Sequence, residues 1–289
     1  QIDGNKATYT GSYNHGIALS SSSNNTVTGN TCNNNNCGIA LSSSSNNTVT
    51  GNTCNNNSSG IYLNSSSNEN TVTGNTCNNN GNGIYLNSSS NNTVTGNTCN
   101  SNNNNGIYLA SSSSDNTVTD NTCNNNSHGI TLYSSSSDNT VTGNTCNNNN
   151  TGIYLSESSN NTITGNTCSD NSNYGIDLDL YSNDNTITGN TCGNNTRTGI
   201  YLNASSNNTM TGNTCSDNDD YGIYLTSSSN NAITGNTCNN NDDYGIYLAA
   251  SCRYSCVVGN VLVDNGTAYS GGGTGNVEAN NVKKDIENT

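Results

Sequence analysis

A short motif, Gly-Ile-x-Leu, returns along the chain at a nearly constant spacing of 22 to 24 residues. Because Ile and Leu stand two residues apart, both point to one face of an extended strand, and the residue between them points to the other face. A period of this length, with turn residues between the copies, predicts stacked supersecondary units. The eleven copies begin at Gly16, Gly38, Gly60, Gly83, Gly106, Gly129, Gly152, Gly175, Gly199, Gly222 and Gly245.

A second block, Asn-Thr-Val-Thr-Gly-Asn-Thr-Cys, lies between the copies of the first, as at residues 47–54 and 92–99. The alternation directs its Val and Cys to the same interior as the Ile and Leu. Each repeat therefore supplies about four small apolar side chains, which only neighbouring repeats can bury. Turns of Ser, Asn and Gly separate the short strands.

These two blocks predict an all-β fold, a right-handed single-stranded parallel β-helix (β-solenoid) of about 11 to 12 coils. We expect an edge coil at 1–15, β-helix repeats at 16–265, and an edge segment with a tail at 266–289. The absence of Pro fits strands that pair on both sides, because Pro cannot donate to the ladder. Asn residues at fixed offsets, such as Asn47, Asn52, Asn70, Asn75, Asn92 and Asn97, are expected at the corners, with left-handed backbone and stacked amides.

Composition alone is typical of disorder, since only 28% of the residues are hydrophobic, and only the order of residues reverses that interpretation. The net charge is −14, with five Lys and Arg against nineteen Asp and Glu. This balance argues against nucleic acid as a partner. No apolar run is long enough to span a bilayer. The chain opens at Gln1, which fits a mature secreted form, so we expect an extracellular, cell-surface or envelope location.

Most of the thirteen cysteines occupy one position of the repeat. Leu262 takes that position in the last copy, so we expect a buried apolar group there and mostly free thiols that act as small hydrophobes. One Cys per coil does not match the paired ligand spacing of zinc sites. The thiol ladder comprises Cys32, Cys54, Cys77, Cys99, Cys123, Cys146, Cys168, Cys192, Cys215 and Cys238.

Three further cysteines break the pattern: Cys37 in a turn of the second coil, and Cys252 and Cys256 in the last well-formed coil. An odd total leaves at least one thiol unpaired within the chain or bonded to another chain. A local Cys252–Cys256 bridge and an intermolecular bond from Cys37 to either of them are the alternatives.

Acidic residues cluster in the later repeats, and we expect them in the same turn of successive coils. They are Asp170, Asp217, Asp219, Asp220, Asp242 and Asp243. Stacked carboxylates repel, so a calcium ion at Asp219, Asp220, Asp242 and Asp243 is one interpretation. The alternative is a solvated acidic edge that keeps the protein soluble. No other cofactor is expected.

The outward residue of Gly-Ile-x-Leu is Tyr in seven copies, which predicts an aromatic column on one exposed face, interrupted by Thr131 and Asp177. An aromatic stripe is typical of a contact surface, and a sugar-binding face would look the same. Alternatively, Tyr simply favours strands and stacks on its neighbours. The seven are Tyr62, Tyr85, Tyr108, Tyr154, Tyr201, Tyr224 and Tyr247.

Catalytic groups for a polysaccharide lyase or hydrolase would be paired carboxylates, or a base near a bound substrate. No two of the central basic residues fall on neighbouring coils, so we expect no catalytic site and a protein that is not an enzyme. The basic residues and histidines are Lys6, Arg197, Arg253, Lys283, Lys284, His15 and His128.

The motif Gly-Ile-x-Leu followed by Asn-x-Val-x-x-Asn-x-(apolar) resembles the parallel β-helix repeat proteins, including the NosD-like and carbohydrate-associated repeats, over residues 16–265. The near-exact, Asn/Ser-rich and Cys-rich repetition is also similar to the amyloid-like sheath proteins of filamentous methanogenic archaea. That likeness implies a structural protein that assembles with itself, head to tail and laterally, into a surface layer, sheath or filament. A carbohydrate-binding surface module or adhesin is the alternative, and a lyase or hydrolase a lesser one. NosD-like proteins are associated with copper enzymes, but one Met and two separated His argue against a copper role here.

Overall fold

The computed structural model describes residues 2–3, 6–8 and 14–285, and it shows strands and turns without a helix in those ranges. Accordingly, no helix in the described ranges could cross a membrane. The chain comprises two compact units, residues 1–145 and 146–289. Parts of the expected amino-terminal edge coil (1, 4–5 and 9–13) and of the expected tail (286–289) lie outside the described residues.

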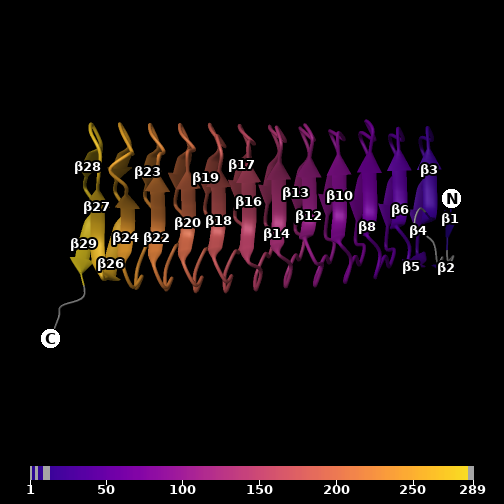
Figure 1. The fold of residues 1–289 in the computed structure, drawn as a ribbon, viewed down its shortest axis with the longest axis horizontal. Coiled ribbons are helices and arrows are strands. Elements are labelled where there is room, and N and C mark those ends of the chain that lie inside the picture. Colours follow the sequence, from indigo (N-terminus) through magenta and orange to yellow (C-terminus); the bar gives the residue numbers. More distant parts are fainter. Residues whose placement is uncertain (1, 4–5, 9–13, 286–289) are drawn as a thin grey trace. The chain divides into compact units, whose positions relative to one another are not determined.

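In the first unit, the Gly-Ile-x-Leu copies form one parallel sheet and the Thr-Val-Thr segments form another (Figure 1). A short pair, β2 (Lys6–Thr8) and β5 (Thr31–Asn33), adds to these. The Gly-Ile-x-Leu sheet holds β3 (His15–Ser20), β6 (Cys37–Ser42), β8 (Ser59–Asn64), β10 (Asn82–Asn87), β12 (Asn105–Ala110) and β14 (His128–Tyr133). The other sheet holds β1 (Ile2–Asp3), β4 (Thr26–Thr28), β7 (Thr48–Thr50), β9 (Thr71–Thr73), β11 (Thr93–Thr95), β13 (Thr117–Thr119) and β15 (Thr140–Thr142).

The second unit repeats this arrangement, and its last pair is β26 (Val261–Asn265) with β29 (Val282–Asp285). Its first sheet holds β16 (Thr151–Ser156), β18 (Tyr174–Asp179), β20 (Thr198–Asn203), β22 (Tyr221–Thr226), β24 (Tyr244–Leu248) and β27 (Thr267–Gly271). Its other sheet holds β17 (Thr162–Thr164), β19 (Thr186–Thr188), β21 (Thr209–Thr211), β23 (Ala232–Thr234), β25 (Cys256–Val258) and β28 (Val277–Ala279). The segment expected as an edge and tail thus contributes three strands, β27 to β29.

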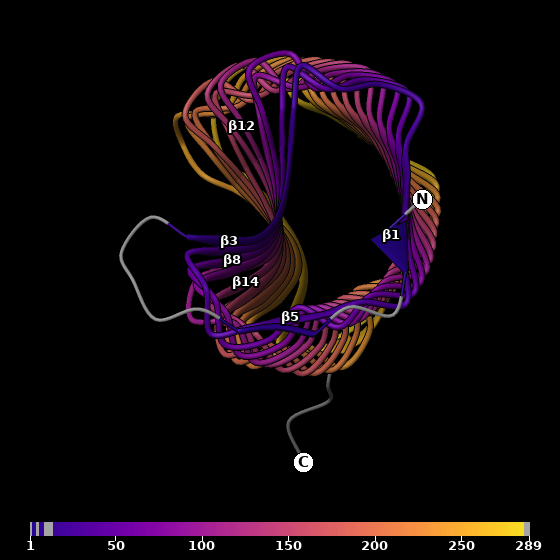
Figure 2. The same ribbon diagram turned by 90° about the vertical axis from the view of Figure 1, so that its right-hand side faces the viewer.

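Neighbouring strands are parallel and in register, so identical residues lie above one another. Ile84 pairs with Ile61 on one side and with Ile107 on the other, and these Ile side chains are fully buried. The residue between Ile and Leu is half-buried on the outer face when it is Tyr. Viewed along the stack, β3, β8 and β14 follow one behind another (Figure 2). The predicted fold, a β-solenoid of about twelve turns, and its assignment of inner and outer faces are confirmed.

The Gly of each Gly-Ile-x-Leu is required by a close approach inside the turn. A Cβ at Gly83 would lie 2.5 Å from the carbonyl oxygen of Gly106 and 2.9 Å from the Cβ of Cys99. Real Cβ atoms do not come this close to other atoms, so the backbone would have to move. The motif therefore begins with Gly because the carbonyl oxygen of the neighbouring strand and the Cβ of a Cys leave no room for a side chain.

Asparagine ladders link consecutive turns, as the stacking of Asn residues predicts. The Asn97 backbone N–H and Nδ2 both donate to Oδ1 of Asn121, at 2.9 and 3.0 Å, and Asn97 Oδ1 accepts the same pair of bonds from Asn75. The expected left-handed backbone at these Asn residues is wrong, since it belongs to the residue before each of them, as at Gly96 (φ 63°). The ladder Asn side chain points inward and is buried. The left-handed residue that turns the chain is therefore the one before it.

Ile107→Asp should unfold the first unit, because it places an unpaired charge in a fully buried column and costs several kcal/mol. Circular dichroism should show loss of the β signal at a temperature where the parent is folded. Tyr108→Asp is the matched control, since that side chain lies on the outer face, and it should keep the fold. The opposite result for the two variants would shift the face assignment by one residue.

Asn97→Ala should lower the free energy of unfolding by about 3 kcal/mol, because it leaves several buried groups without hydrogen-bond partners. These include the carbonyl oxygen of Val72 and the amide of Asn75. Urea denaturation measures the change. Asn103→Ala, at an exposed position in the same turn, should change stability by less than about 0.5 kcal/mol.

Candidate functional site

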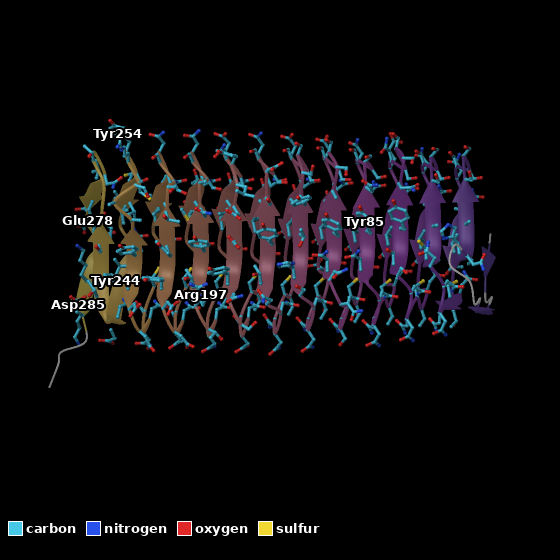
Figure 3. The ribbon with its side chains drawn as sticks, viewed as in Figure 1. Tyr85, Arg197, Tyr244, Tyr254, Glu278 and Asp285 are labelled. Carbon is cyan, nitrogen blue, oxygen red and sulfur yellow. The ribbon has the colours of Figure 1, made fainter. Side chains whose placement is uncertain are left out.

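Stacked rings on the outer face of β8, β10 and β12 form what we call the first tyrosine surface: Tyr62, Tyr85 and Tyr108 (Figure 3 labels Tyr85). Ring centroids lie 4.9 Å apart between Tyr62 and Tyr85 and 4.8 Å apart between Tyr85 and Tyr108. The interplanar angles are 30° and 16°, so the rings face one another along the stack. The inner ring faces are therefore covered, and each side chain remains only partly exposed.

The two ends of this surface differ. At one end Tyr108 pairs in register with the buried Thr131, and Tyr133 tilts beside Tyr108 with a centroid distance of 6.4 Å. At the other end Tyr62 pairs in register with Ala40, whose side chain is a methyl group. Among the described residues, one face of the Tyr62 ring therefore lacks an aromatic neighbour.

Polar atoms beside the first tyrosine surface are left without partners. The Oδ1 atoms of Asn64 and Asn87 are buried and accept no hydrogen bond from any described residue. Asn87 Nδ2 donates to the Tyr62 hydroxyl at 3.3 Å. Burial raises the pKa of Tyr85 to about 12, with Tyr108 and Tyr62 adding to the shift, so its hydroxyl stays a hydrogen-bond donor at neutral pH. Donors and free acceptors thus alternate along one strip.

The second unit carries a wider group, the second tyrosine surface, which the predicted column covers only in part. Its members are Tyr174, Tyr201, Tyr221, Tyr224, Tyr244 and Tyr247. Three of them precede the Gly of the motif, and the sequence analysis missed them although Tyr-Gly-Ile recurs at 174, 221 and 244. Tyr221 contacts Tyr224 at 4.8 Å and Tyr244 contacts Tyr247 at 4.9 Å, so two columns merge. Tyr154 lies half-buried on β16, one turn away.

Asp177 occupies the column position on β18, in register between Tyr154 and Tyr201. The Tyr174 ring lies 4.8 Å from the Tyr201 ring, which is the spacing of consecutive rings in the first tyrosine surface. Tyr174 thus fills the place of the missing column ring and helps to bury Asp177, which is 9% exposed. Within the described part of the chain, its Oδ1 has no hydrogen-bond partner. Burial raises the pKa of Asp177 to about 8, and the charge of Asp179 adds to the shift.

Polar groups surround this carboxyl group on the neighbouring turns. Asp179, on the same face of β18, accepts a 2.8 Å hydrogen bond from Asn203 Nδ2. Arg197 Nη1 donates to the Tyr174 hydroxyl at 3.0 Å, and its guanidinium lies 5.4 Å from the Tyr174 ring centre. Arg197 Nε lies 3.6 Å from Asp220 Oδ2 (Figure 3 labels Arg197). The sequence analysis treated Arg197 as an isolated base and Asp177 as an interruption, because spacing alone does not show that these residues meet.

The late acidic residues all lie in the turn between the repeat Cys and the next Gly-Ile-x-Leu strand, at three different positions of that turn. Asp170 and Asp217 are exposed at a left-handed position two residues after the Cys of the repeat. Asp219 and Asp242 follow four residues after that Cys, and Asp220 and Asp243 five residues after it. No group of three His, Cys, Asp or Glu side chains suited to a metal occurs among the described residues. The calcium interpretation gains no support from this arrangement.

The structure places the ten repeat cysteines in the core, each with no exposed surface, in a column within each unit. Burial raises the pKa of the Cys77, Cys168 and Cys215 thiols. None of the thirteen cysteines, all of which lie in the described ranges, forms a disulfide. Thiols in this setting act as small apolar groups.

The three exceptional cysteines are also largely covered. Cys37 lies in β6 and is 4% exposed, so its expected place in a turn is wrong. Burial raises its pKa to about 11. The Cys252 thiol is fully buried and donates to the carbonyl oxygen of Leu225 at 3.2 Å, whereas Cys256 is partly exposed on β25. A bond to another chain would require Cys37 and Cys252 to leave the core.

Copper ligands are not brought together by this fold. Met210 is fully buried in the core of β21, while His15 and His128 lie on β3 and β14. The cysteines are core residues, and the described residues contain no three-ligand group. The donor set therefore does not fit a copper ion.

Asp177→Asn should stabilise the second unit at pH 8 and leave it unchanged below pH 4. The folded-state pKa is raised from 3.8 to about 8, so the favourable contribution of this carboxyl group is complete below the unfolded pKa. It is lost as the pH rises to about 8, at up to about 1.4 kcal/mol per pH unit. Urea midpoints of variant and parent should diverge between pH 4 and 8. Asp170→Asn, at an exposed turn, should show no such divergence.

Solved structures with this fold include polysaccharide-modifying enzymes. The A-module of mannuronan C-5 epimerase AlgE6 from Azotobacter vinelandii is 17% identical with a TM-score of 0.76, over 91% of this chain and 84% of that one. The periplasmic alginate epimerase AlgG is 17% identical with a TM-score of 0.70, over 90% and 74%. The DFA-IIIase of Arthrobacter chlorophenolicus A6 is 12% identical with a TM-score of 0.61, over 77% and 67%.

The expectation that the chain is not an enzyme is contradicted by these neighbours. Epimerases and a DFA-IIIase have the same solenoid fold, so the fold does not argue against catalysis. At 12 to 17% identity the likeness concerns the fold alone. The resemblance to methanogen sheath proteins finds no counterpart among these structures.

No curated protein matches the chain in sequence. A family model, however, supports the predicted NosD-like resemblance directly. The model described as periplasmic copper-binding protein (NosD) matches residues 1–151, 100–183 and 132–286, which together span nearly the whole chain. The chain therefore belongs to the NosD family of parallel β-helix repeat proteins.

Proposed function

We propose that this chain binds a neutral glycan along the outer face of its Gly-Ile-x-Leu sheet. The observation that carries the proposal is the stacked tyrosine column with partnerless amide oxygens beside it, at Asn64 and Asn87. Tyr suits such a surface because its ring packs on apolar sugar faces while its hydroxyl stays hydrated. The glycan-modifying activities named for the neighbouring structures support a carbohydrate-related role.

The geometry of the column defines how a sugar would bind. Ring faces inside the column are covered by the next ring, so a pyranose can stack only at an end. The Tyr62 face beside Ala40 is such an end, where a methyl group of a 7% exposed residue stands in place of a ring. Hydroxyls of an extended glycan would then follow the row of tyrosine hydroxyls.

Charge favours a neutral glycan over a polyanion. The chain carries five Lys and Arg against nineteen Asp and Glu, and the second tyrosine surface itself contains Asp177 and Asp179. A uronic-acid polymer would be repelled by this surface. The chain therefore differs from the alginate epimerases in the charge of the glycan it binds.

The location we propose is the cell envelope or the extracellular space. The family description and the name of AlgG both specify the periplasm. A glycan-binding surface is of use where cell-wall or surface polysaccharides are present. The cell surface, which the sequence analysis gave as one expected location, is part of this proposal.

Tyr62→Ala should weaken glycan binding at least about tenfold, because it removes the open ring face at the column end. Affinity electrophoresis in gels containing hydroxyethyl cellulose, mannan, inulin or dextran measures the retardation. The parent should be retarded by at least one of these neutral glycans and not by alginate.

Tyr181→Ala is the matched control for this experiment, since Tyr181 is 70% exposed in a turn outside both tyrosine surfaces. It should bind as the parent does. Retardation by alginate alone, or equal retardation of Tyr62→Ala and parent, would refute binding at this surface.

Self-assembly into a layer, sheath or filament is the second function we propose, as the near-exact repeat suggests. Consecutive turns offer one another the same backbone and Asn ladder, which supports the addition of like strands. Electron microscopy of the purified chain without glycan should show ordered fibres or sheets if this holds. A dispersed monomer that binds glycan would refute self-assembly, and only the glycan-binding proposal would remain.

A further inference from the structure

We infer that Asp177 is the proton donor of a glycosidic-bond-hydrolysing site on the second tyrosine surface, with Asp179 as the carboxylate that activates water. This inference rests on the proposed glycan binding and adds a reaction to it. The substrate class is a neutral glycan.

The first observation is the incomplete hydrogen bonding of Asp177. Its side chain is 9% exposed, and Oδ1 contacts no hydrogen-bond partner among the described residues. Buried polar atoms in folded proteins are nearly always partnered, and a catalytic role is one of the reasons for an exception. In the other unit, the buried Thr131 interrupts the column, but its hydroxyl donates to Asn105 Oδ1 at 2.7 Å. The column can therefore be interrupted without an unpartnered oxygen, as it is at Thr131 and is not at Asp177.

The second observation is the environment that keeps this group protonated. The residues that face Asp177 from β16, β18, β20 and the adjoining turns are mostly uncharged rings, and the nearest charge is that of Asp179. Arg197 is directed to Tyr174 and Asp220 instead. A carboxylic acid that stays protonated near neutral pH can donate to a leaving oxygen. The ionisable neighbours are Tyr154, Tyr174, Asp179, Arg197, Tyr201 and Asp220.

The third observation is the second carboxylate on the same face. Asp179 follows Asp177 by two residues on β18, so both carboxyl groups project from the same face of the strand. Hydrolysis with inversion uses such a pair, one carboxyl group as the acid and the other as the base that activates water. Asp179 also accepts the hydrogen bond from Asn203, which fixes its orientation.

Access to Asp177 passes Tyr174. This ring stands in the column place beside Tyr201, where stacking and the hydrogen bond from Arg197 hold it. The side chains of Tyr174 and Arg197 are both half-exposed. A sugar ring that stacks on Tyr201 would take the place of Tyr174 and lie over Asp177. Tyr174 is thus a positioning residue that shields the acid until the glycan binds.

The reaction is a hydrolysis in which all atoms are accounted for. The Asp177 proton passes to the glycosidic oxygen as the bond from that oxygen to the anomeric carbon breaks. Water attacks the anomeric carbon and gives its proton to Asp179. Proton return through solvent restores both groups, and one water molecule is consumed for each bond.

Proton abstraction from a uronate, as in a lyase or an epimerase, fits this site less well. It needs a base together with a cation that neutralises the sugar carboxylate. Arg197 is already paired with Asp220, and burial and Asp243 raise the pKa of Asp220 against the opposing effect of Arg197. A uronate would face Asp177 and Asp179 without a free cation.

The test is release of reducing ends from hydroxyethyl cellulose, mannan, inulin and dextran by the whole chain, with alginate and polygalacturonate as anionic probes. The parent should cleave a neutral glycan that it binds and neither polyanion. Asp177→Asn should reduce the rate at least about 100-fold while its retardation in the same glycan gel stays that of the parent. Asp170→Asn, at an exposed turn, should cleave at the parent rate.

A pH profile separates catalysis from folding. Since the donor must be protonated, the parent rate should fall as the pH rises through about 8, over a range where circular dichroism shows the fold unchanged. Tyr174→Phe, which loses the Arg197 hydrogen bond, should change KM more than kcat.

Each outcome discriminates between the two proposals. If the parent binds a neutral glycan but releases no reducing ends, or if Asp177→Asn cleaves as fast as the parent, hydrolysis at Asp177 is refuted and binding stands. If the parent binds none of the neutral glycans, both proposals fail. Cleavage of alginate alone would overturn the assigned substrate class.

Discussion

In-register stacking of nearly identical turns is the constraint on which the rest of this structure depends. When each residue lies above its counterpart, every position must tolerate copies of itself at the strand spacing of about 4.8 Å. Ile and Leu do so by packing, Asn by donating to the amide oxygen of the next Asn, and Tyr by stacking its ring. The low hydrophobic content is sufficient because the buried set is repeated in every turn.

The same constraint makes a single substitution consequential. Where Asp replaces Tyr at position 177, the column has a gap, and a tyrosine from three residues earlier fills it. The carboxyl group beneath loses water without gaining a hydrogen-bond partner for Oδ1 in the described structure. A regular scaffold can thus acquire a reactive group by one departure from its repeat, without any change in the core.

The inward and outward residues of each strand can vary independently in this fold. Proteins that share the fold can therefore differ in chemistry. The inward residues determine that the turns stack, and the outward residues are free to vary. The epimerases share the solenoid at 17% identity or less, so what they do on their outer faces does not carry over. The family description names copper, yet the His, Met and Cys residues of this chain are placed by the repeat where they cannot meet around an ion.

The sequence by itself determined the fold, because period, alternation and the absence of Pro all point to one solution. It determined that Ile107 is buried and that Tyr108 is not, since a strand has only two faces. Only the tertiary structure decided where the backbone turns left-handed, one residue before the ladder Asn, and that Cys37 lies in a strand. It alone brought Arg197 to the Tyr174 hydroxyl, 23 positions away in the chain, and the Tyr174 ring onto Tyr201, because contacts between neighbouring turns depend on side-chain direction. A repeat pattern predicts which residues stack, but a departure from the repeat is resolved by how the neighbouring side chains repack.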